Sequence, residues 1–278
     1  SGLSDLVLAV GVDQPTNRAR YAQLSGGSTL APGAITPATH FALLASEYMH
    51  ARGLAAEDLA LISVKNHRNG ALNPYAQRPR AFTLEEVMAS SPVVGPFTSL
   101  QCTPVGEGAA AVIVASAEGL RRTGRGRDGA VRVAAAVANS ERGGLRAHHD
   151  LAVTAAGIAA ALAEAQVGAQ ALDVVELHEA FTIEELQYVE AAGICPEGHY
   201  MGWLREGALD IGGRCAVSAS GGLLSMGHPV GPTGLGQIAE ITRQLRGEAG
   251  PRQHPGARLG LAHMVGLGGV GYAHILAA

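Results

Sequence analysis

Three short segments of this 278-residue sequence place histidine beside glycine or an acidic residue directly after an apolar run. The first segment is 177–181 (LHEAF), in which His178 and Glu179 precede a stretch of helical pattern. Histidine changes charge near neutral pH, so His178 is a candidate general acid or base. The start of a helix would account for Glu179 equally well, because the helix dipole stabilises a carboxylate there.

The second segment surrounds a single histidine with glycine. Ser220, Gly221 and Gly222 are followed by 227–234 (GHPVGPTG), which contains His228. Glycine is costly to order, so this density implies that a backbone or a ligand approaches closely. A glycine-rich turn is the plainer interpretation, yet a histidine held between glycine and proline is unusual for a turn. The pattern favours His228 as a general base.

The third segment is 263–269 (HMVGLGG), near the end of the sequence. Backbone amides in a glycine turn can form an oxyanion hole. A tight hairpin between two core strands explains the glycines equally well. This segment alone therefore leaves both interpretations open.

Each segment stands at the end of a predicted strand, where α/β folds collect their functional groups. Short apolar runs predict strands, and longer stretches between them have a helical pattern. The strands are expected at 131–137, 174–177, 215–218, 259–262 and 271–276, and the helices at 154–165, 183–192 and 233–245. This alternation favours a layered α/β fold with helices on both faces of a sheet.

The earlier part of the sequence has a different pattern. Apolar runs at 5–11 and 108–116 predict two buried strands. Between them lies a region rich in proline and turns, with helical stretches at 40–52 and at 83–89, where a threonine and a glutamate have capping-box spacing. A charged, glycine-rich stretch at 119–129 then marks the best internal boundary.

The composition argues against several classes of protein. A net charge of -4 gives no electrostatic reason to expect a nucleic-acid partner. No run approaches the roughly 18 to 20 apolar residues of a membrane span. The 3 cysteines are scattered and form no C-x-x-C pair, which argues against a disulfide framework or a zinc site. We expect a reduced, cytoplasmic protein without a bound metal.

Taken together, in this order and at this spacing, the three segments resemble the C-terminal half of thiolases. The likeness is closest to the sterol carrier protein X (SCP-x) type branch, with its acetyl-CoA acetyltransferase-like and lipid-transfer protein-like members. Three further stretches resemble this branch: 65–68 (KNHR), 73–75 (NPY) and 100–111 (LQCTPVGEGAAA). The resemblance covers 1–278. It implies a layered α/β/α/β/α thiolase fold with two related mixed five-stranded sheets, of which the N-terminal one is incomplete here.

The resemblance also implies a division into domains. Residues 1–13 and 107–118 are a remnant of the N-terminal half, 14–106 is an inserted loop domain, and 130–278 is the C-terminal half. A remnant of two apolar strands would be marginally stable and would expose an edge. We therefore expect the remaining N-terminal segment to be omitted from this sequence or supplied by another chain. A homodimer or homotetramer is implied as well.

Thiolases perform Claisen condensation or its reverse, in which a cysteine attacks an acyl-CoA thioester to give an acyl-enzyme. The resemblance implies that His228 activates this cysteine and that His178 helps to hold the thioester oxygen. Gly266 and Gly268 would help to form a second oxyanion pocket. The residues expected along the pantetheine arm of CoA are Ser220, Gly221 and Gly222. The CoA thioester is a substrate, and no tightly bound cofactor is implied.

The sequence departs from the thiolase pattern at its cysteines. The family's nucleophile lies in a segment upstream of everything present here. Cys102, Cys195 and Cys215 do not match it, and we expect each of them to be a small core residue. The acid/base cysteine is replaced too. Ala180 occupies its place in the SCP-x type branch, and Met264 stands where other branches carry it.

Two other functions fit these departures. The first is a thiolase-fold aldolase that cleaves CoA esters of steroid side chains without a nucleophile, together with a small OB-fold/zinc-ribbon partner. Loss of the acid/base cysteine fits this alternative, whereas the intact His178 and His228 favour a thiolase. The second is a non-catalytic carrier of acyl-CoA or lipid, which Ala180 and Met264 would also suit.

Overall fold

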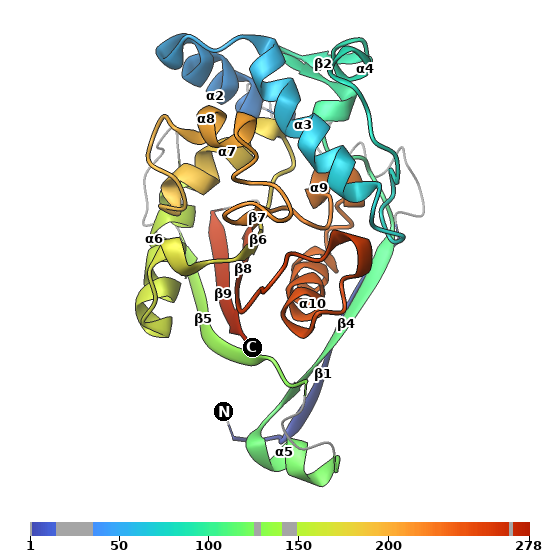
Figure 1. Ribbon diagram of the computed structural model, residues 1–278, viewed down its shortest axis with the longest axis vertical. Coiled ribbons are helices and arrows are strands. Elements are labelled where there is room, and N and C mark those ends of the chain that lie inside the picture. The colour runs from blue at the N-terminus through green and yellow to red at the C-terminus, as the bar shows by residue number, and fades with distance from the viewer. Residues whose placement is uncertain (1, 15–35, 125–128, 141–148, 267–268) are drawn as a thin grey trace.

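The computed structural model describes residues 2–14, 36–124, 129–140, 149–266 and 269–278 (Figure 1). The described chain forms one large mixed sheet, a separate two-stranded ribbon, and a cap of helices and short strands above the sheet. Within these ranges, no helix combines the length and the apolar character that crossing a membrane requires.

The large sheet has five strands in the order β5-β9-β8-β6-β7. Their bounds are β5 (Arg132–Ser140), β6 (Val174–Glu176), β7 (Ala216–Val217), β8 (Leu259–Gly266) and β9 (Val270–Ala277). β6 pairs in parallel with β7 and β8, whereas β9 pairs antiparallel with β5 and β8. This mixed five-stranded sheet confirms the fold expected for the C-terminal half, and each predicted strand of that half is present.

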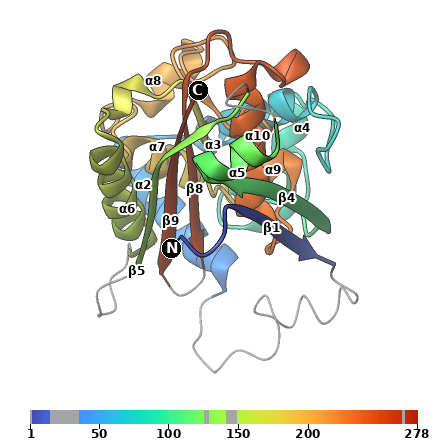
Figure 2. The ribbon, with the colours of Figure 1, turned by 90° about the horizontal axis from the view of Figure 1, so that it is seen from below.

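Helices cover both faces of this sheet, as the strand–helix alternation predicted. α6 (His149–Ala165) packs on β5 and β9, and α10 (Thr233–Arg246) packs on β6 and β8. Figure 2 shows the two helices on opposite sides of the strands. α10 can lie close to the sheet because position 260 is glycine: a Cβ at Gly260 would stand 2.3 Å from Cγ2 of Ile241.

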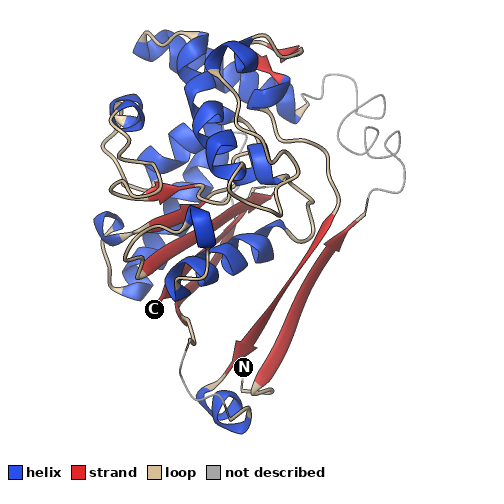
Figure 3. Cartoon of the chain, turned by 45° about the vertical axis from the view of Figure 1, so that its right-hand side comes forward, coloured by secondary structure: helices blue, strands red, loops and turns tan. Residues whose placement is uncertain are grey.

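The ribbon consists of β1 (Leu6–Asp13) and β4 (Gly108–Ala115), which pair antiparallel along their whole length, with α5 (Ala117–Arg122) following β4. It extends away from the main body (Figure 3), and α10 contacts both the ribbon and the large sheet. The ribbon is tied to the segment before α10. The backbone N–H of Val230 donates to Oδ2 of Asp13 at 2.8 Å. A Cβ at Gly11 would stand 2.7 Å from the carbonyl oxygen of Gly231.

The prediction that β1 and β4 are buried strands was wrong. Leu8, Val12 and Ile113 are 63%, 65% and 72% exposed. Continuous apolar runs are typical of strands that are covered on both faces, and for this reason the runs suggested burial. The described part of the chain leaves much of the ribbon uncovered. The pairing of the two strands, in contrast, agrees with the prediction.

The cap combines the region between β1 and β4 with segments from the second half of the chain. Its elements are α2 (Pro37–Arg52), α3 (Ala56–Gly70), α4 (Leu84–Met88), β2 (Pro92–Val94), β3 (Phe97–Thr98), α7 (Thr182–Ala191), α8 (Tyr200–Arg205) and α9 (Gly222–Met226). Phe181 stacks on Phe41 and on Phe97 at ring-centroid distances of 5.2 and 5.3 Å. These rings join the inserted region to the start of α7.

Two helices of the inserted region match their predictions and one was missed. α2 and α4 are present, and α4 starts with the expected capping box, in which Thr83 and Glu86 each accept the other's backbone N–H. α3 was not predicted. Its buried face includes five polar residues, which hide the apolar period of a helix: Ser63, Lys65, Asn66, His67 and Asn69.

Candidate active site

The parallel strands bring the three sequence segments to one edge of the large sheet. His178 follows β6, Ser220 follows β7, and Gly266 is the last residue of β8. Because β6 pairs in parallel with both β7 and β8, the carboxyl ends of these strands lie side by side. This is the kind of edge at which α/β folds collect functional groups.

Two of the candidate catalytic residues, His178 and His228, meet at this edge. Their ring centroids are 4.9 Å apart, and the two ring planes are nearly perpendicular at 85°. Both histidines are partly buried. Imidazoles so close together interact electrostatically, so a positive charge on one opposes a positive charge on the other.

The tautomer of His228 follows from its hydrogen bonds. Its Nδ1 lies 2.9 Å from Oγ1 of Thr233, and that hydroxyl donates to the carbonyl oxygen of Pro229 at 2.5 Å. A hydroxyl has one hydrogen, so Thr233 accepts from His228, and the proton of the neutral ring sits on Nδ1. Burial and the neighbouring His178 lower the pKa of His228 to about 3. The Nε2 atom of His228 therefore carries a lone pair and can act as a base.

His178 is backed by a carboxylate that the sequence did not indicate. Its Nδ1 lies 3.4 Å from Oε1 of Glu184, which is fully buried in the first turn of α7. Oε2 of Glu184 accepts the backbone N–H of Phe181 at 2.9 Å, and Oε1 accepts the hydroxyl of Tyr188 at 3.1 Å. Burial raises the pKa of Glu184, and the contact with His178 acts in the opposite direction.

The structure corrects the role suggested for Glu179. At the start of α7 it is Glu184, and not Glu179, that accepts a backbone N–H. Glu179 is fully buried, and its Oε1 accepts the hydroxyl of Ser218 at 3.0 Å and the backbone N–H of Leu223 at 2.9 Å. Its pKa is raised well above the usual value, first by burial and then by Glu185. Glu179 therefore holds the loop before α9 and is not a helix cap.

The glycines after β7 lie against protein atoms. Ser220 is fully buried, and its backbone N–H and hydroxyl both donate to Glu176, at 2.9 and 2.6 Å. A Cβ at Gly221 would stand 2.5 Å from Cα of Gly70, and one at Gly222 would stand 1.5 Å from Oε1 of Glu179. Close approach by α3 and by a buried carboxylate thus accounts for these glycines. Contact of this loop with CoA stays a prediction.

The third segment forms a hairpin between β8 and β9. The backbone N–H of Gly269 donates to the carbonyl oxygen of Gly266 at 3.2 Å, and Gly269 has a φ of 67°. Gly268 lies outside the described residues, so the oxyanion pocket expected at Gly266 and Gly268 stays a prediction. His263 is buried within β8, and its Nε2 lies 3.0 Å from Oγ1 of Thr154.

A buried ion pair holds the cap above the site. Lys65 on α3 lies 3.0 Å from Oε1 of Glu185 on α7, and its Nζ also donates to the carbonyl oxygen of Val217 at 2.7 Å. Asn66 and Tyr200 donate to the same carboxylate at 2.7 and 2.5 Å. The stretch 65–68, which resembles the SCP-x type branch, thus positions α3 over the strand ends through Val217 and Glu185.

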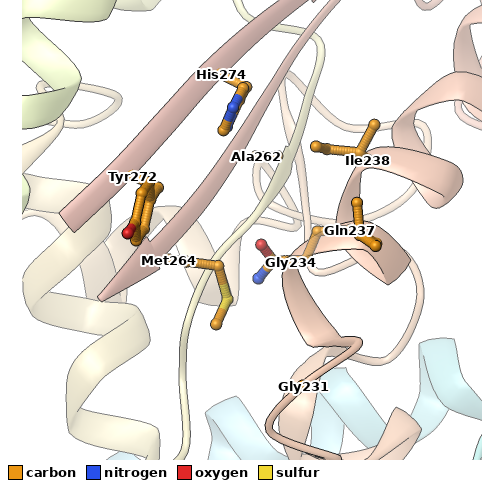
Figure 4. A pocket seen from close by; sticks show the side chains of 9 residues that line it. Gly231, Gly234, Gln237, Ile238, Ala262, Met264, Tyr272 and His274 are labelled. Carbon is orange, nitrogen blue, oxygen red and sulfur yellow. The ribbon is translucent and has the colours of Figure 1, made fainter. Parts of the chain in front are cut away.

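A small cavity of about 260 Å³ lies between α10 and the β8–β9 pair (Figure 4). Met264 and Tyr272 line it from the sheet, and Gly234 and Ile238 line it from the helix. Gly231 and Gly234, which also line it, belong to the same segment as His228. Met264, one of the two positions at which a cysteine was expected, faces this space.

The three cysteines are buried and free, as predicted for core residues. Burial raises the pKa of Cys102, Cys195 and Cys215 to about 12 each, so that none is a thiolate near neutral pH. Ala180 is also buried, and its carbonyl oxygen accepts the backbone N–H of Thr103 at 2.8 Å. None of these cysteines has the features of an activated nucleophile.

Sequence reasoning missed Glu184 and Thr233. Glu184 stands three residues after Phe181, a spacing typical of a carboxylate that caps a helix. Thr233 stands one turn after Pro229 at the start of α10, where a hydroxyl can accept from a nearby ring. Both signals are short and common in sequences, and only the structure shows that each side chain faces a histidine.

Comparison with known proteins assigns the family. The family described as "Thiolase C-terminal domain-like" matches residues 137–277. Benzoylsuccinyl-CoA thiolase subunit BbsB of Thauera aromatica is 36% identical over 277 residues, covering 96% of this chain and 70% of that protein. The chain belongs to the thiolase family. Among its relatives, sterol carrier protein 2 of Rattus norvegicus is 39% identical over 236 residues, covering 82% of the chain and 43% of that protein.

Solved structures show the same architecture. The Ltp2-ChsH2(DUF35) aldolase superposes on this thiolase-family chain with a TM-score of 0.80 at 25% identity, covering 100% of the chain and 73% of that one. The sequence resemblance to the thiolase superfamily and to its SCP-x type branch is therefore confirmed. The chain spans less than half the length of the rat relative.

Proposed function

We propose that this thiolase-family chain belongs to an acyltransferase that acts on acyl-CoA thioesters, by Claisen condensation or by thiolytic cleavage. The observation that carries this proposal is the state of His228. Its Nδ1–H is used by Thr233, its ring is neutral, and it lies against the ring of His178 at the strand ends, which leaves Nε2 with a lone pair. A carrier that only binds acyl-CoA has no need of such a base.

In this proposal His228 activates a cysteine that is not among the 278 residues. Nε2 of His228 takes the thiol proton, and the thiolate attacks the thioester carbonyl to give an acyl-enzyme. His178 stands beside the thioester oxygen. Gly266 and Gly268 would supply the second oxyanion pocket through backbone N–H groups.

We further propose that the pantetheine arm of CoA runs along the cap. Ser220, Gly221 and Gly222 would form that wall, with their shape held by Glu176 and by the contact with α3. The CoA thioester would be substrate and not a resident cofactor. A homodimer or homotetramer is also proposed, and the exposed apolar side chains of the β1–β4 ribbon support it.

The test uses the intact natural protein with an acyl-CoA and free CoA. The expected results are turnover and, in mass spectrometry, an acyl adduct on one cysteine. His228→Asn should lower kcat about 10²- to 10⁴-fold, the usual contribution of a general base. His50→Asn is the matched control, because His50 is exposed on α2 far along the chain from the site. Absence of both turnover and adduct in the wild-type protein would reject the proposal.

A second candidate is an aldolase that works with a small partner of the DUF35 type. Two observations favour it: Ala180 and Met264 stand where the acid/base cysteine is expected, and the aldolase neighbour matches the whole chain. The same intact protein distinguishes the two functions. An aldolase would release an aldehyde or ketone without free CoA and would resist thiol alkylation, whereas the proposed acyltransferase would be inactivated by it.

A further inference from the structure

Glu184 is placed to accept hydrogen bonds and not to donate them. Its side chain is fully buried at the third position of α7, where the helix dipole stabilises a negative charge. The backbone N–H of Phe181 can only donate, and it occupies Oε2 at 2.9 Å. The hydroxyl of Tyr188 donates to Oε1 at 3.1 Å. These donors lower the pKa of Glu184, against the effect of its burial, and so favour the ionised carboxylate.

Nδ1 of His178 also lies near this carboxylate, 3.4 Å from Oε1 of Glu184. This is longer than a good hydrogen bond, and catalytic hydrogen bonds are often long before substrate tightens them. Within the described residues, Nδ1 is buried and has no other hydrogen-bond partner. An ionised Glu184 can satisfy Nδ1 only if Nδ1 carries the proton. The neutral ring of His178 then has its lone pair on Nε2.

This tautomer changes what His178 can do. A neutral ring with a bare Nε2 cannot donate to a thioester oxygen, but it can take a proton. Thiolase chemistry requires a second acid/base group besides the base that activates the cysteine. The two places where the family carries that group hold Ala180 and Met264, and neither side chain titrates.

We propose that His178, positioned by Glu184, is the second acid/base of this site and transfers the proton of the substrate α-carbon. The proposal rests on the function proposed above. In the condensation direction, Nε2 of His178 takes the α-proton, and the C–H electron pair becomes the carbon–carbon double bond of an enolate. The carbonyl π electrons move onto oxygen. The Nε2–H of the resulting imidazolium can then donate to that oxygen. Thiolytic cleavage runs these steps in reverse and returns the proton to carbon.

The contact between the two imidazoles gives each of them a different proton to transfer. With ring centroids 4.9 Å apart, His178 and His228 do not both hold a positive charge easily. His228 faces a hydroxyl, whereas His178 faces a buried carboxylate. The positive charge is therefore more stable on His178. His228 therefore accepts the proton of the cysteine thiol, and His178 accepts the proton of the substrate α-carbon.

The main test compares Glu184→Gln with Glu190→Gln in the intact natural protein. Glu190 lies on the same helix and accepts hydrogen bonds from Tyr48 and Gly198, away from the histidines. Glu184→Gln should lower kcat, and the rate of α-hydrogen exchange of the acyl-CoA in D2O, about 10²- to 10⁴-fold. KM should stay within about threefold, because substrate binding does not use this carboxylate. Glu190→Gln should leave both rates unchanged.

A second measurement does not depend on activity. Nitrogen-15 NMR of histidine-labelled protein should show His178 as the Nδ1–H tautomer, and Glu184→Gln should shift it toward Nε2–H. If the wild-type protein turns over but Glu184→Gln keeps its kcat, this inference fails while the proposed function stands. An Nε2–H tautomer in the wild-type protein would overturn it as well. If the wild-type protein shows neither turnover nor α-hydrogen exchange, the proposed function itself is rejected.

Discussion

Lys65 on α3 and Glu185 on α7 form an ion pair of 3.0 Å in which both side chains are buried. Removing one partner leaves an uncompensated charge in the interior, which typically costs about 3 to 5 kcal/mol. We expect Lys65→Met to lower the free energy of unfolding by that amount. Urea denaturation measures it. The double variant Lys65→Met/Glu185→Gln removes both charges, keeps an acceptor for Asn66 and Tyr200, and should recover most of the loss. An equally unstable double variant would contradict this account.

The hydroxyl of Thr233 orients the ring of His228. We expect Thr233→Val to lower kcat by up to about 10²-fold, because Nδ1–H of His228 loses its acceptor and the lone pair on Nε2 is then misplaced. Thr233→Ser keeps the hydroxyl and should retain most of the activity. Initial-rate kinetics with an acyl-CoA checks both variants. Full activity of Thr233→Val together with a loss in Thr233→Ser would show that the methyl group, and not the hydroxyl, matters.

Buried histidines should make stability depend on pH. Burial lowers the pKa of His263 and His228 to about 3, and that of His67 to about 4, from 6.5. Below pH 6.5 the unfolded chain therefore binds more protons than the folded one. The free energy of unfolding falls as the pH decreases, by at most about 1.4 kcal/mol per pH unit for each group.

Glu176 changes the free energy of unfolding in the opposite direction. Burial raises its pKa from 4.5 to about 8, so its contribution to stability is present below pH 4.5 and is lost as the pH rises through that range. The decrease in the free energy of unfolding that the histidines cause is therefore clearest between about pH 3 and 4.5, where Glu176 is protonated in both states. His263→Gln should flatten the dependence there in urea titrations at several pH values. His50→Gln, at an exposed position, should not change it. Parallel curves for wild type and His263→Gln would exclude this origin.

Two glycines test how closely α10 is packed. Gly260→Ala would bring a Cβ within 2.3 Å of Ile241 and should destabilise the fold by about 1 to 3 kcal/mol. Gly236→Ala, on α10, meets no atom within 4 Å and should stabilise it by about 0.5 to 1 kcal/mol. Thermal unfolding of both variants gives the comparison. If Gly260→Ala left the stability unchanged, α10 would be able to shift away from the sheet.

Local patterns in the sequence were sufficient for the strands of the large sheet and for α6, α7 and α10, because each has a regular apolar run with clear ends. The burial of β1 and β4 could not be predicted, since it depends on what covers them and not on their own residues. α3 was missed because its buried side carries Lys65 and Asn66, whose partners come from distant segments.

The same distinction holds at the candidate site. His178 and His228 could be found from the sequence, because histidine beside glycine or glutamate is rare enough to stand out. Their partners could not. Glu184 and Thr233 look like ordinary helix-start residues, and their roles arise from side-chain directions that become visible only when β6 and α10 are placed.

The contact between Gly11 and Gly231 limits how this sequence can evolve. A side chain at position 11 would collide with the carbonyl oxygen of Gly231, three residues after His228, and Asp13 holds the same stretch through Val230. A change at position 11 would displace the segment that carries His228, so the position of this histidine also depends on a strand that lies outside the large sheet.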